Sequence, residues 1–211
     1  MGSDILTKIL FGVPSILIAF VVHEICHGYS AFLFGDPTAK YEGRFSIDPR
    51  KHIDPIGAGV LIFTLLFSPF VIGWAKPVKV NPYNFKSPRQ HMAWVAFAGP
   101  LSNFTMAAIA GIPIKFGMIS SGILFQFLMV FVMVNIGLGL FNLIPIPPLD
   151  GSKILYGILP SKQAYDLMEM ERQYATYIPL VLAAVIFLMP GWIIAIPYGF
   201  LMRLFLGQGL F

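Results

Sequence analysis

Long apolar stretches separated by short polar loops dominate the order of hydrophobic and polar positions along the chain. About 20 apolar residues cross a bilayer as a helix, and this length predicts membrane segments at residues 5–34, 56–73, 87–112 (interrupted at Gly99-Pro100), 121–141, 175–189 and 192–206. Residues 74–82 alternate and contain prolines, so they are expected to be extended and strand-like. Three prolines in residues 142–151 predict a break in the backbone after the fourth segment.

The composition supports a membrane protein. The 211 residues are 57% hydrophobic and only 11% charged, whereas about 25% is usual for a soluble domain. This excludes a disordered chain, a disulfide scaffold and an ordinary soluble enzyme. Eleven of the 14 Lys and Arg residues lie in three loop clusters, at residues 40–51, 76–89 and 153–172. Such clusters can bind nucleic acid, but between apolar segments they indicate cytoplasmic loops instead.

The first apolar segment contains the pentapeptide His23-Glu24-Ile25-Cys26-His27, an H-E-x-x-H pattern. Residues four apart lie on one face of a helix, so both imidazoles can bind one metal ion while the Glu acts as a base on water. Zinc is the first candidate, and it would lower the pKa of a bound water to about 7. The alternative is a buried His–Glu group that only makes hydrogen bonds between helices, although ionisable residues at membrane depth are usually functional.

A catalytic zinc site of this type needs a third protein ligand. Apart from Glu24, nearly all of the ten carboxylates lie in polar loops or at the chain end. The exception is Asp150, which follows an apolar segment inside the proline-rich break, where a broken helix can line a cavity. Leu149-Asp150-Gly151 could also be an ordinary turn. The missing ligand favours Asp150 as the third ligand, with one zinc ion per chain.

Three motifs in this order resemble the site-2 protease family of intramembrane zinc metalloproteases. They are His23-Glu24-x-x-His27, residues 98–103 (Ala-Gly-Pro-Leu-Ser-Asn), and Asn142-x-x-Pro145 continuing to Leu149-Asp150-Gly151. Residues 35–40, 52–55 and 74–78 further resemble a compact prokaryotic branch that lacks PDZ and CBS domains. The resemblance implies His23, His27 and Asp150 as zinc ligands, Glu24 as the catalytic base, and a contact between Asn142 and the substrate backbone.

Geometry restricts the topology independently of any family. His27 and Asp150 lie near the C-terminal ends of their segments, so a shared ion requires those two segments to run in the same direction. One of the two segments between them must therefore turn back, and the break at Ser68-Pro69 followed by residues 74–82 predicts a re-entrant hairpin. Twelve of the 14 basic residues then lie on the cytoplasmic side, opposite Lys8 and Lys115.

The extended segment and the proline-rich break suggest how a substrate is held. An unwound membrane helix could pair with either by strand addition, which makes Lys76, Pro77 and Val78 candidate substrate-binding residues. Two further side chains are weaker candidates. Asn103 either hydrogen-bonds between helices or acts in the site, and His52 is either an ordinary loop histidine or a contact of the site.

These observations predict an all-α integral membrane protein, a polytopic bundle of about five to six segments forming a single domain over residues 1–211. Residues 5–151 would be the catalytic core, with accessory spans at 175–207. The expected function is a zinc endopeptidase that cuts transmembrane protein substrates within the lipid bilayer of a prokaryotic cell membrane, with its active site opening to the cytoplasm and with no nucleic-acid partner. The alternatives are a non-proteolytic metal-binding membrane protein (an inactive relative acting as a chaperone, or a metal transporter) and another class of membrane zinc protease. The substrate and the oligomeric state are not encoded in any motif.

Overall fold

The computed structural model describes residues 6–67, 73–178 and 191–207, together with positions 180, 182, 184 and 188. The long helices in this part are α2 (Val13–Leu33), α5 (Pro88–Lys115) and α6 (Gly122–Asn142). The shorter elements are η1 (Lys8–Gly12), α3 (Thr38–Tyr41), η2 (Pro49–Lys51), α4 (Pro55–Phe67), η3 (Pro82–Asn84), α7 (Asp150–Ile158), α8 (Ser161–Gln173), η4 (Ala175–Tyr177) and α10 (Trp192–Leu206). The prediction of an all-helical protein is confirmed for the described residues.

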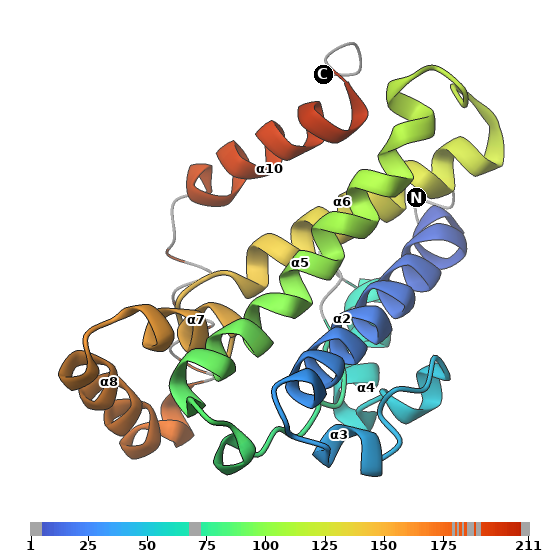
Figure 1. Ribbon diagram of the computed structural model, residues 1–211. Coiled ribbons are helices and arrows are strands. Elements are labelled where there is room, and N and C mark those ends of the chain that lie inside the picture. Colours follow the sequence, from blue (N-terminus) through green and yellow to red (C-terminus); the bar gives the residue numbers. More distant parts are fainter. Residues whose placement is uncertain are drawn as a thin grey trace.

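Helix α5 packs against both α2 and α6, and the three long helices form the body of the molecule (Figure 1). Helices α2 and α6 run in the same direction and α5 runs in the opposite one (Figure 1). This is the relation that a shared ion between His27 and Asp150 requires. One buried cluster joins α5, α6 and α10, through residues that include Ala107, Ile136 and Met202.

The three candidate membrane spans within the described residues are Lys8–Leu33, which joins η1 to α2, and helices α5 and α6. Their outward faces expose large apolar side chains such as Ile18, Ile109 and Ile123. A helix that is apolar on its exposed side as well as its buried side is suited to lipid rather than water. The expected number of five to six membrane segments stays a prediction, because α10 is a shorter apolar helix and most of residues 175–189 lie outside the described residues.

The predicted interruption at Gly99-Pro100 is wrong, because α5 continues through both residues to Lys115. Proline removes only one backbone hydrogen bond from a helix, and packed neighbours can hold the helix at that point. Gly99 and Pro100 are both buried within α5, where neighbouring helices surround them. The predicted start of this helix is confirmed, with Ser87 as the N-cap residue and Pro88 as the first helical residue.

Residues 74–81 are non-helical, as expected of extended chain or strand, and η3 begins at Pro82. Within the described residues they form no regular strand, only an isolated antiparallel bridge between Ile53 and Ala75. Pro77 lacks an N–H group, so a regular ladder cannot form through it. The bridge nevertheless places the two ends of segment 54–74 beside each other. Helix α4 in this segment has 13 residues and is therefore about 20 Å long, which is shorter than the roughly 30 Å of a bilayer core.

The predicted break after the fourth segment is confirmed. Helix α6 ends at Asn142, residues 143–149 form turns, and α7 begins at Asp150. The turns return the chain toward the bundle, where α7 packs against α5. This local path carries Asp150 to the face of α2 that bears the two histidines.

Candidate metal centre

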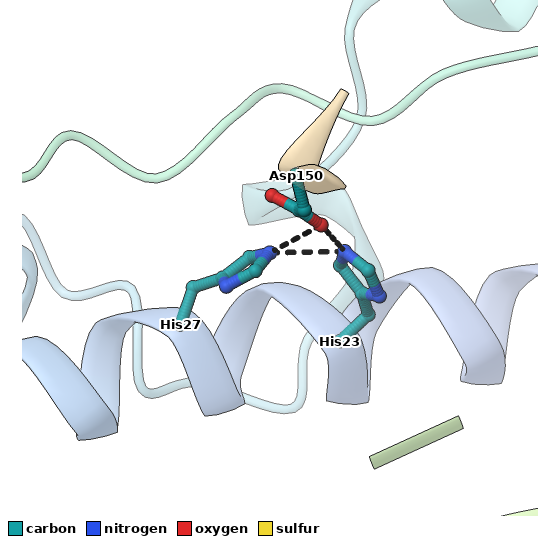
Figure 2. A group of neighbouring side chains, drawn as sticks. All are labelled: His23, His27 and Asp150. Carbon is teal, nitrogen blue, oxygen red and sulfur yellow. Dashed lines mark hydrogen bonds and ion pairs between the residues drawn. The ribbon is translucent and has the colours of Figure 1, made fainter. Parts of the chain in front are cut away.

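The structure brings His23, His27 and Asp150 together in one buried cluster, the only group of three or more potential metal-binding residues among those described. Their exposed fractions are 3%, 8% and 7%. Both imidazoles project from α2 toward the Asp150 carboxylate (Figure 2). The two Nε2 atoms are 2.9 Å apart, and Asp150 Oδ2 is 3.1 Å from His23 Nε2 and 3.2 Å from His27 Nε2.

These separations suit a tetrahedral zinc ion. Ligand atoms 2.0–2.1 Å from a tetrahedral ion lie roughly 3.3 Å from one another. The three observed distances of 2.9 to 3.2 Å fall slightly short of this edge length. A small outward movement of each side chain would therefore admit the ion and leave its fourth position open.

The partners of the two Nδ1 atoms determine which way the imidazoles face. His27 Nδ1 is 2.7 Å from the carbonyl oxygen of Val95, which can only accept a hydrogen bond. Nδ1 must therefore carry the proton, and the Nε2 of a neutral ring presents its lone pair to the cluster. This places an acceptor atom against the Asp150 carboxylate, an arrangement that a bound cation stabilises.

A chain of two buried asparagine amides fixes the orientation and the proton position of the His23 imidazole in the same way. Asn135 Nδ2 donates to Phe131 O at 2.9 Å, so Asn135 Oδ1 accepts from Asn103 Nδ2 at 3.0 Å. Asn103 Oδ1 is then the acceptor for His23 Nδ1, at 2.7 Å. Both asparagines are fully buried. Asn103 thus acts through His23 and fixes the orientation of that imidazole.

Gly99 has no side chain, and the imidazoles of the cluster occupy the space that a side chain there would fill. A Cβ atom added there would lie 2.5 Å from His27 Nε2 and 2.6 Å from His23 Nε2. Any side chain at this position of α5 would therefore overlap the ligand atoms.

Asp150 depends on a similarly tight approach at Gly151. A Cβ atom at Gly151 would lie 2.3 Å from Leu143 O and 2.4 Å from Ile144 O. The first turn of α7 therefore packs directly on the turn that leaves α6. This contact explains why a glycine follows the acidic residue.

Glu24 lies beside the cluster but is not part of it. Its Oε2 atom accepts a hydrogen bond from the Val78 backbone N–H at 2.8 Å. One carboxylate oxygen is thereby engaged, and the other can accept a proton from water. This arrangement is suited to a base rather than to a metal ligand.

The remaining candidates are placed differently. His52 is buried, contacts Ser46 O through Nε2 at 2.7 Å, and lies outside the cluster. Asn142 is the last residue of α6 and donates from its amide nitrogen to Leu138 O, 3.0 Å away in its own helix. Lys76 uses its backbone N–H and C=O for contacts with His52 O and Arg44.

Asn135, Gly99 and Val95 have roles at the cluster that the sequence alone did not predict. Asn135 had a detectable signal, since it is a lone amide within an apolar segment and such a residue needs a buried partner. Gly99 and the carbonyl group of Val95 had no such signal in the sequence, because their roles depend on how closely α5 packs against α2.

An apolar cavity of about 460 Å³ adjoins the helices that carry the site. Residues Phe20 of α2, Leu61 of α4, and Leu138 and Phe141 of α6 line it. Phe20 precedes His23 by less than one turn, and Phe141 adjoins Asn142. The cavity therefore runs beside α2, which carries the two histidines, and beside α6 near Asn142.

The comparisons with known proteins agree on one class. The model of Peptidase family M50 matches residues 111–186, a range that includes Asp150. The "Putative zinc metalloprotease YwhC" of Bacillus subtilis is 40% identical over 157 residues, which are 70% of this chain and 68% of that protein. The "Putative zinc metalloprotease Rip2" of Mycobacterium tuberculosis is 28% identical over 189 residues, 86% of this chain and 69% of that protein. No solved structure matches the chain.

Proposed function

Because this chain belongs to peptidase family M50, the family of site-2 proteases, we propose that it is a zinc-dependent peptidase that cuts peptide bonds in or near the membrane-spanning segments of other proteins. The observation that carries the proposal is the convergence of two Nε2 atoms and one carboxylate oxygen beside an engaged glutamate. The three ligand residues are His23, His27 and Asp150, for one zinc ion per chain.

Two residues, Glu24 and Asn142, act on the substrate beside the three metal ligands. When bound, zinc supplies a Lewis acid for the scissile carbonyl and lowers the pKa of water at the site. Glu24 takes the proton of the attacking water and later passes it to the nitrogen of the leaving amine. Asn142 orients the peptide. Its amide nitrogen is bonded within α6, and among the described contacts its Oδ1 atom has no donor, so this oxygen is available to a peptide N–H.

The extended segment holds the unwound substrate over the site in this proposal. Lys76 and Val78 already use backbone groups within the chain. Among the described residues, the backbone groups of Lys79 and Val80 make no hydrogen bond, so they and the carbonyls of Pro77 and Val78 are the groups left for strand addition. Replacing residues 76–80 with a Gly/Ser stretch should abolish cleavage and preserve zinc binding, and full activity after that replacement would contradict this role.

Membrane insertion follows from the three spanning helices and from segment 54–74. The bridge between Ile53 and Ala75 supports a re-entrant path, because a segment that starts and ends at one place does not cross the bilayer. The basic loops then face the cytoplasm. Arg203 was expected among the cytoplasmic basic residues, but it lies at the same end of the bundle as Lys115. The carbonyl oxygen of its neighbour Leu204 accepts a hydrogen bond from Lys115 Nζ at 2.9 Å. Three of the 14 basic residues therefore lie at the end opposite the loops.

The test is zinc per chain together with cleavage of a membrane-spanning reporter, in wild type, Glu24→Gln and Asp150→Ala. We expect one zinc in wild type and in Glu24→Gln, much less in Asp150→Ala, and cleavage in wild type alone. Bound zinc without cleavage of any membrane reporter would favour the non-proteolytic metal-binding alternative. Equal metal in all three proteins would remove Asp150 from the ligand set.

A further inference from the structure

Segment 76–81 lies on the face of α2 that carries Glu24. Besides the bond between Val78 N–H and Glu24 Oε2, this face contacts the segment at Gly28, one turn further along α2. A Cβ atom at Gly28 would lie 2.9 Å from Ala39 Cβ and 3.5 Å from Val78 Cγ1. The glycine therefore lets α3, which lies between Asp36 and Arg44 in the chain, pack closely on α2, and Val78 is in ordinary van der Waals contact with the same position.

Arg44 holds the first residue of this segment. Its side chain is 4% exposed, and its two terminal nitrogens donate to the carbonyl oxygens of Lys51 and Lys76. The backbone N–H of Lys76 also donates to His52 O at 2.7 Å. A guanidinium group is a planar fork with fixed donor directions, so it can bridge two carbonyls in a way that the single ammonium of lysine cannot.

Asp36 holds the last residue of the segment. Gly35, with φ at +105°, lets the chain reverse after α2, so that Asp36 lies close to the end of that helix. Asp36 is fully buried. Its Oδ2 atom accepts from Asn81 N at 2.7 Å, and its Oδ1 atom accepts from Asn84 Nδ2 at 2.7 Å and from Thr38 Oγ1 at 2.5 Å. Burial alone would raise the pKa of Asp36, but these hydrogen bonds outweigh it and hold the pKa below its ordinary value.

We propose that Asp36 and Arg44 are positioning residues of the peptidase site, which fix the two ends of segment 76–81 so that the Val78 N–H group holds the Glu24 carboxylate in place. The proposal rests on the proposed peptidase function for its catalytic consequence. Neither residue touches the ligand cluster. Both act through the segment, and the segment acts on the base.

The physical reason is the freedom of the glutamate. A Glu side chain has several rotatable bonds and loses substantial entropy when one conformation is required. One backbone N–H restricts it only if that N–H is itself held, and only four residues lie between the two anchors at Lys76 and Asn81. The ion pair between Lys79 Nζ and Glu42 Oε1, at 2.9 Å, is largely exposed and contributes little to holding the segment.

The experiment uses Asp36→Asn and Arg44→Lys in the full-length, zinc-loaded protein. Asparagine keeps the size of Asp36 but turns an NH₂ group toward one of the N–H donors, and lysine leaves one of the two carbonyls without its donor. We expect kcat to fall about 10- to 100-fold, KM to change by less than about threefold, and zinc per chain to stay at the wild-type value. Glu42→Gln is the matched control, since it removes only the exposed ion pair, and it should keep wild-type kcat.

Amide hydrogen exchange of residues 76–81 provides a readout that does not depend on peptidase activity. We expect slow exchange at Val78 in wild type and Glu42→Gln, and faster exchange in Asp36→Asn and Arg44→Lys. Gly28→Ala is the second perturbation, needed if a buried-charge variant fails to fold, because its added Cβ atom would overlap Ala39 of α3, which lies between the two anchors in the chain, and would shift them without removing either. It should also speed exchange at Val78 and lower kcat.

The outcomes separate the two proposals. If wild type binds zinc but cleaves no membrane reporter, the peptidase function fails and the exchange data alone decide whether Asp36 and Arg44 hold the segment. Unchanged exchange in both variants, or kcat within twofold of wild type in both, would overturn the positioning role. A loss of kcat that parallels loss of zinc would also overturn it, because the residues would then support only the scaffold.

Discussion

Replacing Gly99 with alanine tests the metal centre without removing a ligand. The added Cβ atom would lie 2.5 Å from His27 Nε2 and 2.6 Å from His23 Nε2. Ordinary contact between such atoms needs about 3.5 Å, so the imidazoles or helix α5 would have to move by about 1 Å. Zinc–ligand distances are held to within about 0.2 Å, and a displacement of this size therefore breaks the site.

The magnitude follows from two opposing effects. Alanine in a helix interior is more stable than glycine by about 0.5–1 kcal/mol, whereas overpacking in a buried site costs about 1–3 kcal/mol. Loss of an outer partner of a metal ligand weakens binding about 10- to 100-fold. A methyl group placed against two ligand atoms should weaken it by at least 100-fold, which is about 2.7 kcal/mol.

The assay is zinc per chain after dialysis against a weak chelator, together with the change in melting temperature that zinc produces. Gly99→Ala should contain little zinc and show almost no zinc-dependent stabilisation. Gly199→Ala in α10 is the matched control, since a Cβ atom there meets nothing within 4 Å, and it should bind zinc as wild type does. A Gly99→Ala protein with one zinc per chain and wild-type cleavage would refute the assignment of this cluster.

Three further outcomes follow from the same contacts. Asn135→Ala removes the acceptor for Asn103 Nδ2 and should weaken zinc binding about 10- to 100-fold, as measured by competition with a chelator; an unchanged affinity would show that the amide chain does not orient His23. Gly151→Ala places a Cβ atom 2.3 Å from Leu143 O and should lower zinc per chain in the same way as Asp150→Ala, whereas normal zinc content would mean that α7 tolerates the shift. The pKa of Asp36 is lowered in the folded protein, so its stabilising contribution is complete above the unfolded-state pKa of about 3.9 and is lost as pH falls through the lower folded-state pKa. Melting temperatures should therefore drop more steeply below pH 4 in wild type than in Asp36→Asn, and parallel curves would argue against this linkage.

Residue spacing alone predicted the chemistry of the first helix. Two histidines four residues apart lie on one face of any α-helix, because the helical repeat is local. Apolar length likewise predicted the three long helices, because a helix of about 20 apolar residues matches the bilayer core whatever its neighbours. Asp150 could be selected because few carboxylates are available outside polar loops in a chain with ten Asp and Glu residues.

Local rules failed where packing had the larger effect. Gly99-Pro100 predicted an interruption, but neighbouring helices hold α5 continuous and use the glycine as space for the imidazoles. Alternation and prolines in residues 74–82 predicted extended chain or strand, and residues 74–81 are non-helical. No regular ladder forms there, because the backbone groups of Lys76, Val78 and Asn81 bond to separate partners on α2 and the loops around it.

The sequence by itself therefore determined which side chains are candidate ligands, the spacing of the two histidines on α2 and the apolar length of the long helices. Only the tertiary structure decided which groups orient them. His23 reaches Asn103 across 80 positions and Asp150 across 127, and Asp36 reaches Asn81 across 45. Contacts over such separations depend on which helix faces meet and how closely, and that is set by the packing of the whole bundle rather than by the residues on either side of each partner.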